Sequence, residues 1–128
     1  MTADEQLRFV IHEHYARAHH FDLRLERDGV RVSWAVPKGM PTDPKRNRLA
    51  VRVEDHDLDH IDFVDPTPVD DAEPGAIAKS IWDHGHYLTI KWEERKVVVD
   101  LIGERINARY AVFHTNDNQW MVHLMGDG

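Results

Sequence analysis

The chain has 128 residues, carries a formal net charge of -7 and contains no cysteine. Size scaling predicts that a chain of this length folds as one domain, here residues 1–128, and buries about two thirds of its unfolded surface. The lack of cysteine excludes disulfides and thiolate metal sites, so any metal would have to be bound by nitrogen and oxygen ligands.

The N-terminal segment and the distribution of charge indicate the class of protein. Residues 1–10 lack a basic start followed by an apolar core, and the longest apolar runs are far too short to span a bilayer. We therefore expect a cytoplasmic protein without membrane contact. Residues 54–73 contain nine acidic and no basic residues, whereas residues 1–53 contain ten basic and seven acidic ones. This uneven distribution of charge along the chain favours a local phosphate-binding site over a surface that binds DNA broadly.

Two strands and a tight turn are predicted after an initial strand in residues 7–14. Residues 21–36 alternate between apolar and polar side chains on both sides of Asp28-Gly29, a pair that favours the positive φ angles of a type I′ hairpin. One face of the hairpin is then apolar and should point to the core. Its predicted cross-strand pairs are Leu25 with Val32, Leu23 with Trp34 and Phe21 with Val36.

The opposite face of the same hairpin is polar. It carries His20, Asp22, Arg24 and Glu26 on the first strand, with Ser33 opposite Arg24 and Arg31 opposite Glu26. His20 and Asp22 project from one face, and His14 lies on the preceding strand. Two imidazoles and a carboxylate suit manganese, iron, cobalt or zinc better than calcium. From these residues alone, a polar face exposed to water remains an equal alternative.

Arg24 adds an argument for an anionic ligand. A guanidinium next to a metal suits a tetrahedral oxyanion, because its fork holds two phosphate oxygens. The alternative role is an ion pair with Glu26 or a neighbouring residue. His56 and His60 are four residues apart; they could share a helical face or flank a turn, but taken alone they are more typical of surface positions.

The remaining segments predict further short strands. These are expected in residues 49–55, 87–94, 96–102, 108–114 and 119–125, with a turn at 115–118 and a long irregular stretch at 65–75. Residues 74–85 (PGAIAKSIWDHG) are expected to hold a short helical turn. The succession predicts a mostly β fold: an antiparallel β-barrel of about eight strands with short helical turns.

Two segments, HEHYARAHHFDLRLERDGVRVSWAVPKG and RLAVRVEDHDLDH, resemble the 3'-phosphoesterase domain of bacterial DNA ligase D, the end-healing module of bacterial non-homologous end joining. The resemblance covers roughly residues 8–125. It implies a compact β-barrel and a manganese-dependent phosphoesterase that removes a 3'-terminal ribonucleoside and then hydrolyses the resulting 3'-phosphate. Cobalt and zinc are alternative metals.

The resemblance also implies roles for individual residues. The metal ligands would be His14, His20 and Asp22. The phosphate-binding residues would be Arg24, Ser33, Lys38, Arg48, His56 and His60, of which Arg24, His56 and His60 would be catalytic.

Three features depart from the family pattern. His60 stands where the family commonly has tyrosine, although imidazole can also donate to phosphate. Residues 69–76 (VDDAEPGA) replace a loop rich in glycine and glutamate, and the usual basic N-terminal arm has no counterpart in this sequence. We also find no counterpart of the family's polymerase and ligase domains in this sequence. The expected partners are therefore DNA 3' ends and, by noncovalent contact, a ligase, polymerase or end-binding protein.

Two other functions remain open at this point. His20 and Asp22 with a distant histidine, such as His84 or His114, also fit the metal site of a non-haem iron oxygenase on a β-barrel. An oxygenase function would not explain why Arg24, Lys38 and Arg48 are present, because it needs no phosphate-binding residues. The second alternative is a non-catalytic module that binds DNA ends or a partner protein.

Overall fold

The computed structural model describes residues 7–57, 64–70 and 72–126, and within them all regular elements are β-strands. In chain order these are β1 (Leu7–Tyr15), β2 (His19–Arg27), β3 (Val30–Val36), β4 (Arg48–Asp57), β5 (Asp65–Pro68), β6 (Ile77–Glu93), β7 (Lys96–Gly103), β8 (Asn107–Asn116) and β9 (Gln119–Gly126). No helix in these residues is long and apolar enough to cross a membrane.

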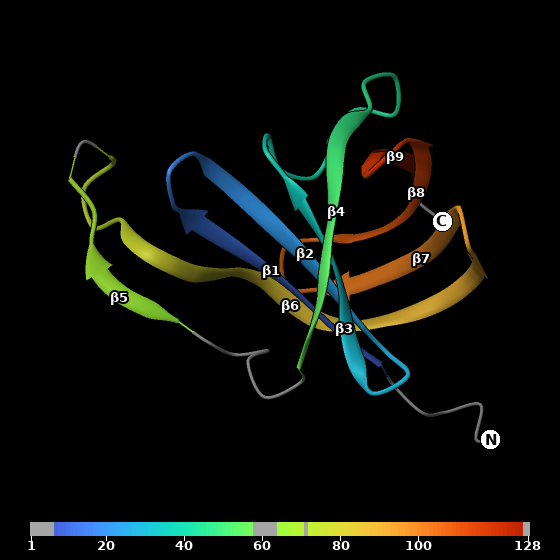
Figure 1. The fold of residues 1–128 in the computed structure, drawn as a ribbon, viewed down its shortest axis with the longest axis horizontal. Helices are drawn as coiled ribbons and strands as arrows, with labels where there is room; N and C mark the ends of the chain where they lie inside the picture. The colour runs from blue at the N-terminus through green and yellow to red at the C-terminus, as the bar shows by residue number, and fades with distance from the viewer. Residues whose placement is uncertain (1–6, 58–63, 71, 127–128) are drawn as a thin grey trace.

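Eight of the strands close into an antiparallel barrel (Figure 1). The strand order is β1-β2-β3-β4-β9-β8-β7-β6, and a pairing between β1 and β6 closes the ring. The remaining strand, β5, is not part of the ring. It pairs with the beginning of β6 on an extension beside the barrel. The predicted antiparallel barrel of about eight strands is therefore confirmed.

The hairpin of β2 and β3 has the predicted register. Asp28 and Gly29 have φ angles of 53° and 83°, as the type I′ turn requires. Leu25 pairs with Val32, Leu23 with Trp34, Phe21 with Val36, Arg24 with Ser33, and Glu26 with Arg31. A turn of two residues leaves no freedom to shift this pairing, so the turn determines which side chains share a face.

The apolar face of this hairpin points into the barrel. Leu23, Leu25, Trp34 and Val36 are each at most 1% exposed and belong to one core cluster. The cluster also includes Phe9, Ile11, Tyr87, Val99, Leu101, Val112, Trp120 and Val122, which come from the other walls of the barrel. Because the interior is filled by side chains, the polar face of the hairpin lies on the outside of the barrel.

Residues 74–85 do not contain the helical turn that we expected. Pro74 and Gly75 form a turn, in which Gly75 has a φ of 85°, and a strand starts at Ile77. The first part of β6 is hydrogen-bonded to β1 on one edge and to β5 on the other. These pairings with distant segments outweigh the local preference of the sequence, because they satisfy the backbone on both sides.

A buried carboxylate connects β6 to the turn between β7 and β8. Asp83 accepts hydrogen bonds from the backbone N–H groups of His84, Glu104, Arg105 and Ile106 at 2.8–3.1 Å. A Cβ atom on Gly103 would lie 2.6 Å from Asp83 Oδ2, so only glycine allows this close approach. The contact fixes β6 to the turn between β7 and β8.

Tyr87 provides a second link across the barrel wall. Its side chain is 2% exposed, and its hydroxyl donates a hydrogen bond to the backbone carbonyl of Glu26 on β2. Burial raises the pKa of Tyr87 to about 12. The phenol therefore stays neutral in the folded protein at pH values where it ionises in the unfolded chain.

This difference predicts a loss of stability at alkaline pH. The contribution is complete below pH 10, the ordinary pKa of tyrosine, and is lost as the pH rises toward about 12; it amounts to about 2–3 kcal/mol. Denaturant unfolding at pH 8 and pH 11.5 should show this loss in the wild type. Tyr87→Phe should lack this part of the loss, whereas Tyr15→Phe, which removes a partly buried phenol at the end of β1, should retain it. Equal losses in both variants would contradict the assignment.

Candidate active site

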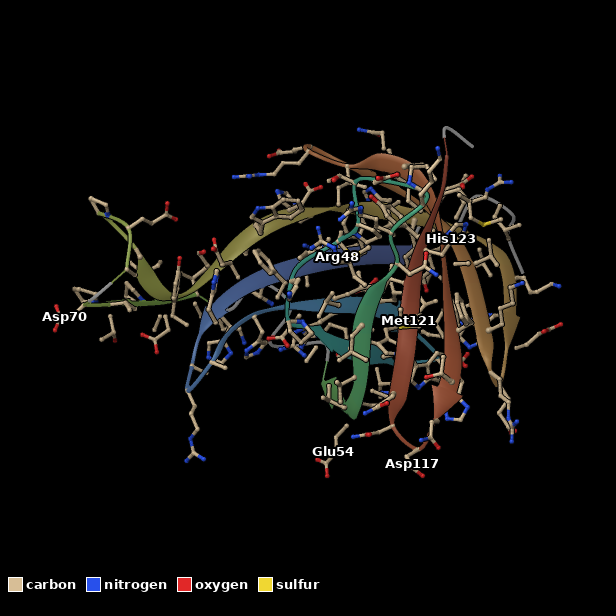
Figure 2. The ribbon with its side chains drawn as sticks, turned by 90° about the horizontal axis from the view of Figure 1, so that it is seen from above. Arg48, Glu54, Asp70, Asp117, Met121 and His123 are labelled. Carbon is tan, nitrogen blue, oxygen red and sulfur yellow. The ribbon has the colours of Figure 1, made fainter. Side chains whose placement is uncertain are left out.

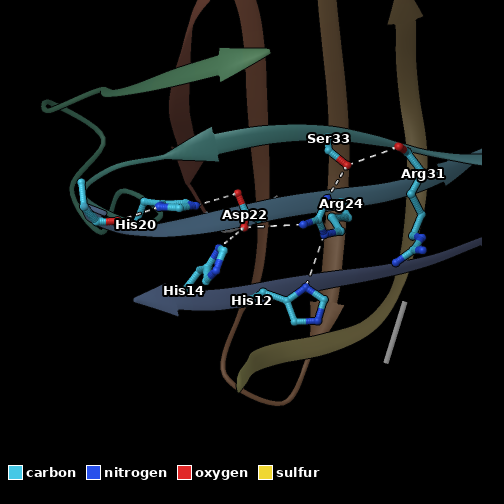
Figure 3. A network of polar contacts seen from close by, with 8 residues as sticks. His12, His14, His20, Asp22, Arg24, Arg31 and Ser33 are labelled. Carbon is cyan, nitrogen blue, oxygen red and sulfur yellow. Dashed lines mark hydrogen bonds and ion pairs between the residues drawn. The ribbon is translucent and has the colours of Figure 1, made fainter. Parts of the chain in front are cut away.

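The polar outer face of β1, β2 and β3 brings the predicted site residues together. His14 on β1 pairs with His20 on β2, and Asp22 follows His20 by two residues on the same face. Arg24 lies two residues further along β2, opposite Ser33 on β3. The alternation that fills the core with leucine and tryptophan therefore also lines up these polar side chains (Figure 3).

Three of these residues form a group with the spacing of metal ligands. One ligand atom from each of His14, His20 and Asp22 lies within 4.8 Å of the others. Asp22 is buried, and both histidines are partly buried. His14 Nδ1 lies 3.7 Å from Asp22 Oδ2, and His20 Nε2 lies 3.3 Å from Asp22 Oδ1. Two imidazole nitrogens and a carboxylate oxygen converge here without any rearrangement of the backbone.

The ring of His20 is oriented by a backbone contact. Its Nδ1 lies 2.9 Å from the carbonyl oxygen of Ala18, which can only accept, so Nδ1 carries a proton. In the neutral ring the lone pair is then on Nε2, the nitrogen that faces Asp22. Metal-binding histidines commonly use the second ring nitrogen in this way, because it fixes the tautomer and the orientation of the ring.

Hydrogen bonding and charge keep Asp22 ionised. Burial opposes ionisation, but the hydrogen bond from His20 and the positive charge of Arg24 outweigh it and lower the pKa of Asp22. The same hydrogen bond raises the pKa of His20, against the effect of burial. In contrast, burial and the neighbouring His20 lower the pKa of His14. The carboxylate is therefore available as an anionic ligand, and His14 is readily neutral.

Arg24 connects the carboxylate to β3 and β1. Its guanidinium lies 3.5 Å from Asp22 Oδ2 and donates to Ser33 Oγ at 3.1 Å and to His12 Nδ1 at 3.4 Å (Figure 3). Ser33 in turn donates to the carbonyl of Arg31 at 3.3 Å. These contacts hold the cation directly beside the candidate metal ligands, where it could bind the oxygens of a phosphate.

Lys38 and Arg48 contact each other near the start of β4. The guanidinium of Arg48 donates to the backbone carbonyl of Lys38, and the lysine side chain is exposed. Figure 2 shows Arg48 and Glu54 toward opposite ends of β4. Among the described contacts, none joins either basic residue to Arg24 or Ser33.

The structure does not describe the side chains of the two remaining candidates. His56 is on β4, with its backbone paired to Arg31, but its side chain lies outside the described part of the chain. His60 lies entirely outside the described residues.

Sequence reasoning did not assign His12, Arg31 or Lys79 to this site. His12 and Arg31 are completely buried, and His12 accepts from Arg24. Side chains two residues apart on a strand project from the same face. His12 therefore shares a face with His14 on β1, and Arg31 with Ser33 on β3, so the sequence pattern could have placed both at the site. Lys79 had no such signal, since its segment was expected to contain a helical turn.

The histidines considered for an iron site have other partners. His84 Nε2 lies 3.7 Å from Glu104, and His114 Nε2 donates to the backbone carbonyl of Asp117 at 2.7 Å. Within the described residues, the one group with metal-ligand spacing contains neither of them.

Comparison with known proteins places these residues in a family. The profile described as "DNA Ligase D 3'-phosphoesterase domain" matches residues 12–114. A protein of Mycobacterium bovis named "Multifunctional non-homologous end joining protein LigD" is 47% identical over 121 residues, which cover 91% of this chain and 16% of that protein.

Two further relatives with the same name come from other organisms. The protein of Mycolicibacterium smegmatis is 43% identical over 131 residues, covering 94% of this chain and 17% of its own length. The protein of Pseudomonas aeruginosa is 37% identical over 131 residues, covering 95% of this chain and 15% of its own length. The chain thus spans about one sixth of these relatives.

The geometry predicts that the three-residue group binds a divalent metal. Calorimetric titration of the wild type with Mn²⁺ should show one site, and His20→Ala and Asp22→Ala should each weaken binding by at least about tenfold, because each removes a ligand. His86→Ala, which changes an exposed histidine on β6, is the matched control. Unchanged affinity in both ligand variants would show that the metal binds elsewhere.

Proposed function

The chain belongs to the DNA ligase D 3'-phosphoesterase domain family, and on this premise we propose that it is a manganese-dependent phosphoesterase that heals DNA 3' ends during non-homologous end joining. The observation that carries the proposal is the position of Arg24. It connects the group His14, His20 and Asp22 to Ser33, so that a metal and a phosphate could be bound side by side.

The donor atoms fit the proposed metal. The two nitrogens and one carboxylate oxygen of His14, His20 and Asp22 suit Mn²⁺, and the same set would accept Co²⁺ or Zn²⁺. When bound, such a metal polarises a phosphate oxygen and lowers the pKa of a coordinated water. The protein holds these ligands through the His20–Ala18 hydrogen bond and the pairing of β1 with β2.

Arg24 would bind the reacting phosphate. Its guanidinium is buried between Asp22 and Ser33, so it is held in place before substrate arrives. Binding phosphate would exchange part of these contacts for bonds to two phosphate oxygens, and the fixed positive charge would stabilise the added negative charge of the transition state. Ser33 would donate its hydroxyl to the same group.

The other predicted residues complete the proposed phosphate site. We assign phosphate contacts to Lys38, Arg48, His56 and His60. His56 and His60 would also act in catalysis, with an imidazole donating a hydrogen bond or a proton to the phosphate or leaving group. These assignments rest on the family resemblance of the two sequence segments.

The proposed reaction has two hydrolytic steps. In the first, water forms a bond to phosphorus while the bond to the 5'-oxygen of the terminal ribonucleoside breaks; the leaving oxygen gains a proton, and the DNA keeps a 3'-phosphate. In the second, another water attacks phosphorus, the bond to the 3'-oxygen breaks, and the products are inorganic phosphate and a 3'-OH end. Such an end is what a ligase or polymerase requires.

The partners of the reaction follow from this chemistry and from the names of the relatives. The substrate would be a DNA 3' end in a primer-template, carrying a ribonucleotide or a phosphate. A ligase, polymerase or end-binding protein would meet this domain by noncovalent contact where these activities are on separate chains.

We predict that Arg24 contributes most of the electrostatic catalysis. With end-labelled primer-template DNA carrying a 3'-ribonucleotide, Mn²⁺ should support conversion to the 3'-phosphate and 3'-OH products, and chelator should prevent it. Arg24→Ala should slow the conversion by about a hundredfold to a thousandfold, because a buried charge that faces the transition state is removed. His20→Ala should abolish it.

Arg27→Ala is the control for this experiment. Arg27 is on the same strand, but it donates to Thr89 and stacks on Trp92, 4.4 Å from the ring centroid. Its replacement should leave the rate within about twofold, as is usual for surface changes. Failure of the wild type to convert either substrate with any divalent metal would refute the proposed activity and favour a non-catalytic module that binds DNA ends.

A further inference from the structure

Lys79 lies on the same face of the sheet as the candidate metal ligands. It is on β6, and its Cα pairs with that of His14 on β1. Directly opposed residues of antiparallel strands project to the same side of the sheet. On its other edge β6 pairs Lys79 with Asp65 of β5. The register therefore places the ammonium group of Lys79 next to His14. It lies on the side of the site opposite to β3, because the strand order there is β3-β2-β1-β6.

The charged groups around Lys79 agree with this placement. Among the described residues, the groups that interact electrostatically with it include Arg24, Asp22, Arg31 and Asp65. The lysine is half-buried; burial, followed by the positive charge of Arg24, lowers its pKa. Its own charge contributes to the lowered pKa of His14. Lys79 thus shares one electrostatic environment with a ligand and with the arginine assigned to phosphate.

Asp65, which pairs with Lys79 across β5 and β6, is itself hydrogen-bonded within β5. Asp65 is on the short edge strand β5, and its Oδ1 accepts from both the backbone N–H and the hydroxyl of Thr67, at 3.1 and 2.7 Å. Lys79 is half-buried in the neighbourhood of two guanidinium groups, those of Arg24 and Arg31. The repulsion by Arg24 and Arg31 is relieved when an anion binds among the three cations.

We propose that Lys79 is a second cationic contact for the reacting phosphate and makes the site favour a dianionic 3'-phosphate over a monoanionic phosphodiester. This inference rests on the proposed function, since it concerns the same site. A phosphate held between Arg24 and Lys79 has a cation on each side, with the ligands His14 and Asp22 between them.

The preference follows from charge. A terminal phosphate monoester carries close to two negative charges at neutral pH, whereas a diester carries one. The attraction to a fixed ammonium is proportional to the charge of the ligand. A charge-assisted contact that contributes about tenfold to binding of the monoester should therefore contribute only about threefold for the diester.

The test compares both substrates in Lys79→Gln. The KM for DNA with a 3'-phosphate should rise about tenfold and the KM for DNA with a 3'-ribonucleotide about threefold, with smaller changes in kcat. Lys79→Arg should restore most of the preference, because it keeps the charge. Lys91→Gln, which removes an exposed lysine on the same strand, should change neither KM.

A binding measurement separates this inference from the proposed activity. In chelator, where no turnover occurs, fluorescence anisotropy should show that the wild type, Lys79→Arg and Lys91→Gln bind a 3'-phosphate oligonucleotide more tightly than its 3'-OH counterpart. Lys79→Gln should show a preference about tenfold weaker, because only the Arg24 contact remains. The wild type could show a binding preference that depends on Lys79 and yet be inactive with every divalent metal. That result would refute the proposed activity and support the contact of Lys79 with the phosphate. Equal preference in Lys79→Gln and the wild type, or no preference in either, would overturn the role of Lys79.

Discussion

The alternation of side chains across the β2–β3 hairpin is the constraint on which the rest of the structure depends. A two-residue turn at Asp28-Gly29 fixes the register, so that Leu23 and Leu25 fill the barrel while Asp22 and Arg24 lie outside. A slip by one residue would place a carboxylate and a guanidinium in the core and expose the leucines, at a cost of several kcal/mol for each buried charge. The stability of the barrel and the composition of the candidate site are therefore determined by the same pairing.

Asp22 is the centre of the polar network that results. It is within 3.3–3.7 Å of His20, His14 and Arg24, and it is buried. A carboxylate surrounded by three groups that are positive or can become so is strongly held in its ionised form, which accounts for its lowered pKa. A divalent metal would be bound between Asp22 and His20 of β2 and His14 of β1, in place of a proton on His20 Nε2. Arg24 would then remain beside the metal as the group that can exchange contacts with a phosphate.

The sequence was sufficient where structure is determined locally and insufficient where it depends on distant pairing. The register of the hairpin, the shared face of His20, Asp22 and Arg24, and the barrel class follow from period-two alternation and one turn. The extension of β6 to Ile77 does not, because it is stabilised by hydrogen bonds to β1 and β5, which are far away in the chain. The place of Lys79 at the site is a consequence of that pairing, and so could not be predicted.

The most direct test of the account is to locate the metal. Crystals grown with Mn²⁺ should give an anomalous difference peak at the manganese absorption edge, about 2.0–2.3 Å from an imidazole nitrogen of His14, Nε2 of His20 and a carboxylate oxygen of Asp22. A peak at this position would establish the metal centre on which the proposed chemistry depends. A peak among other residues, or no peak near these three at saturating Mn²⁺, would contradict it.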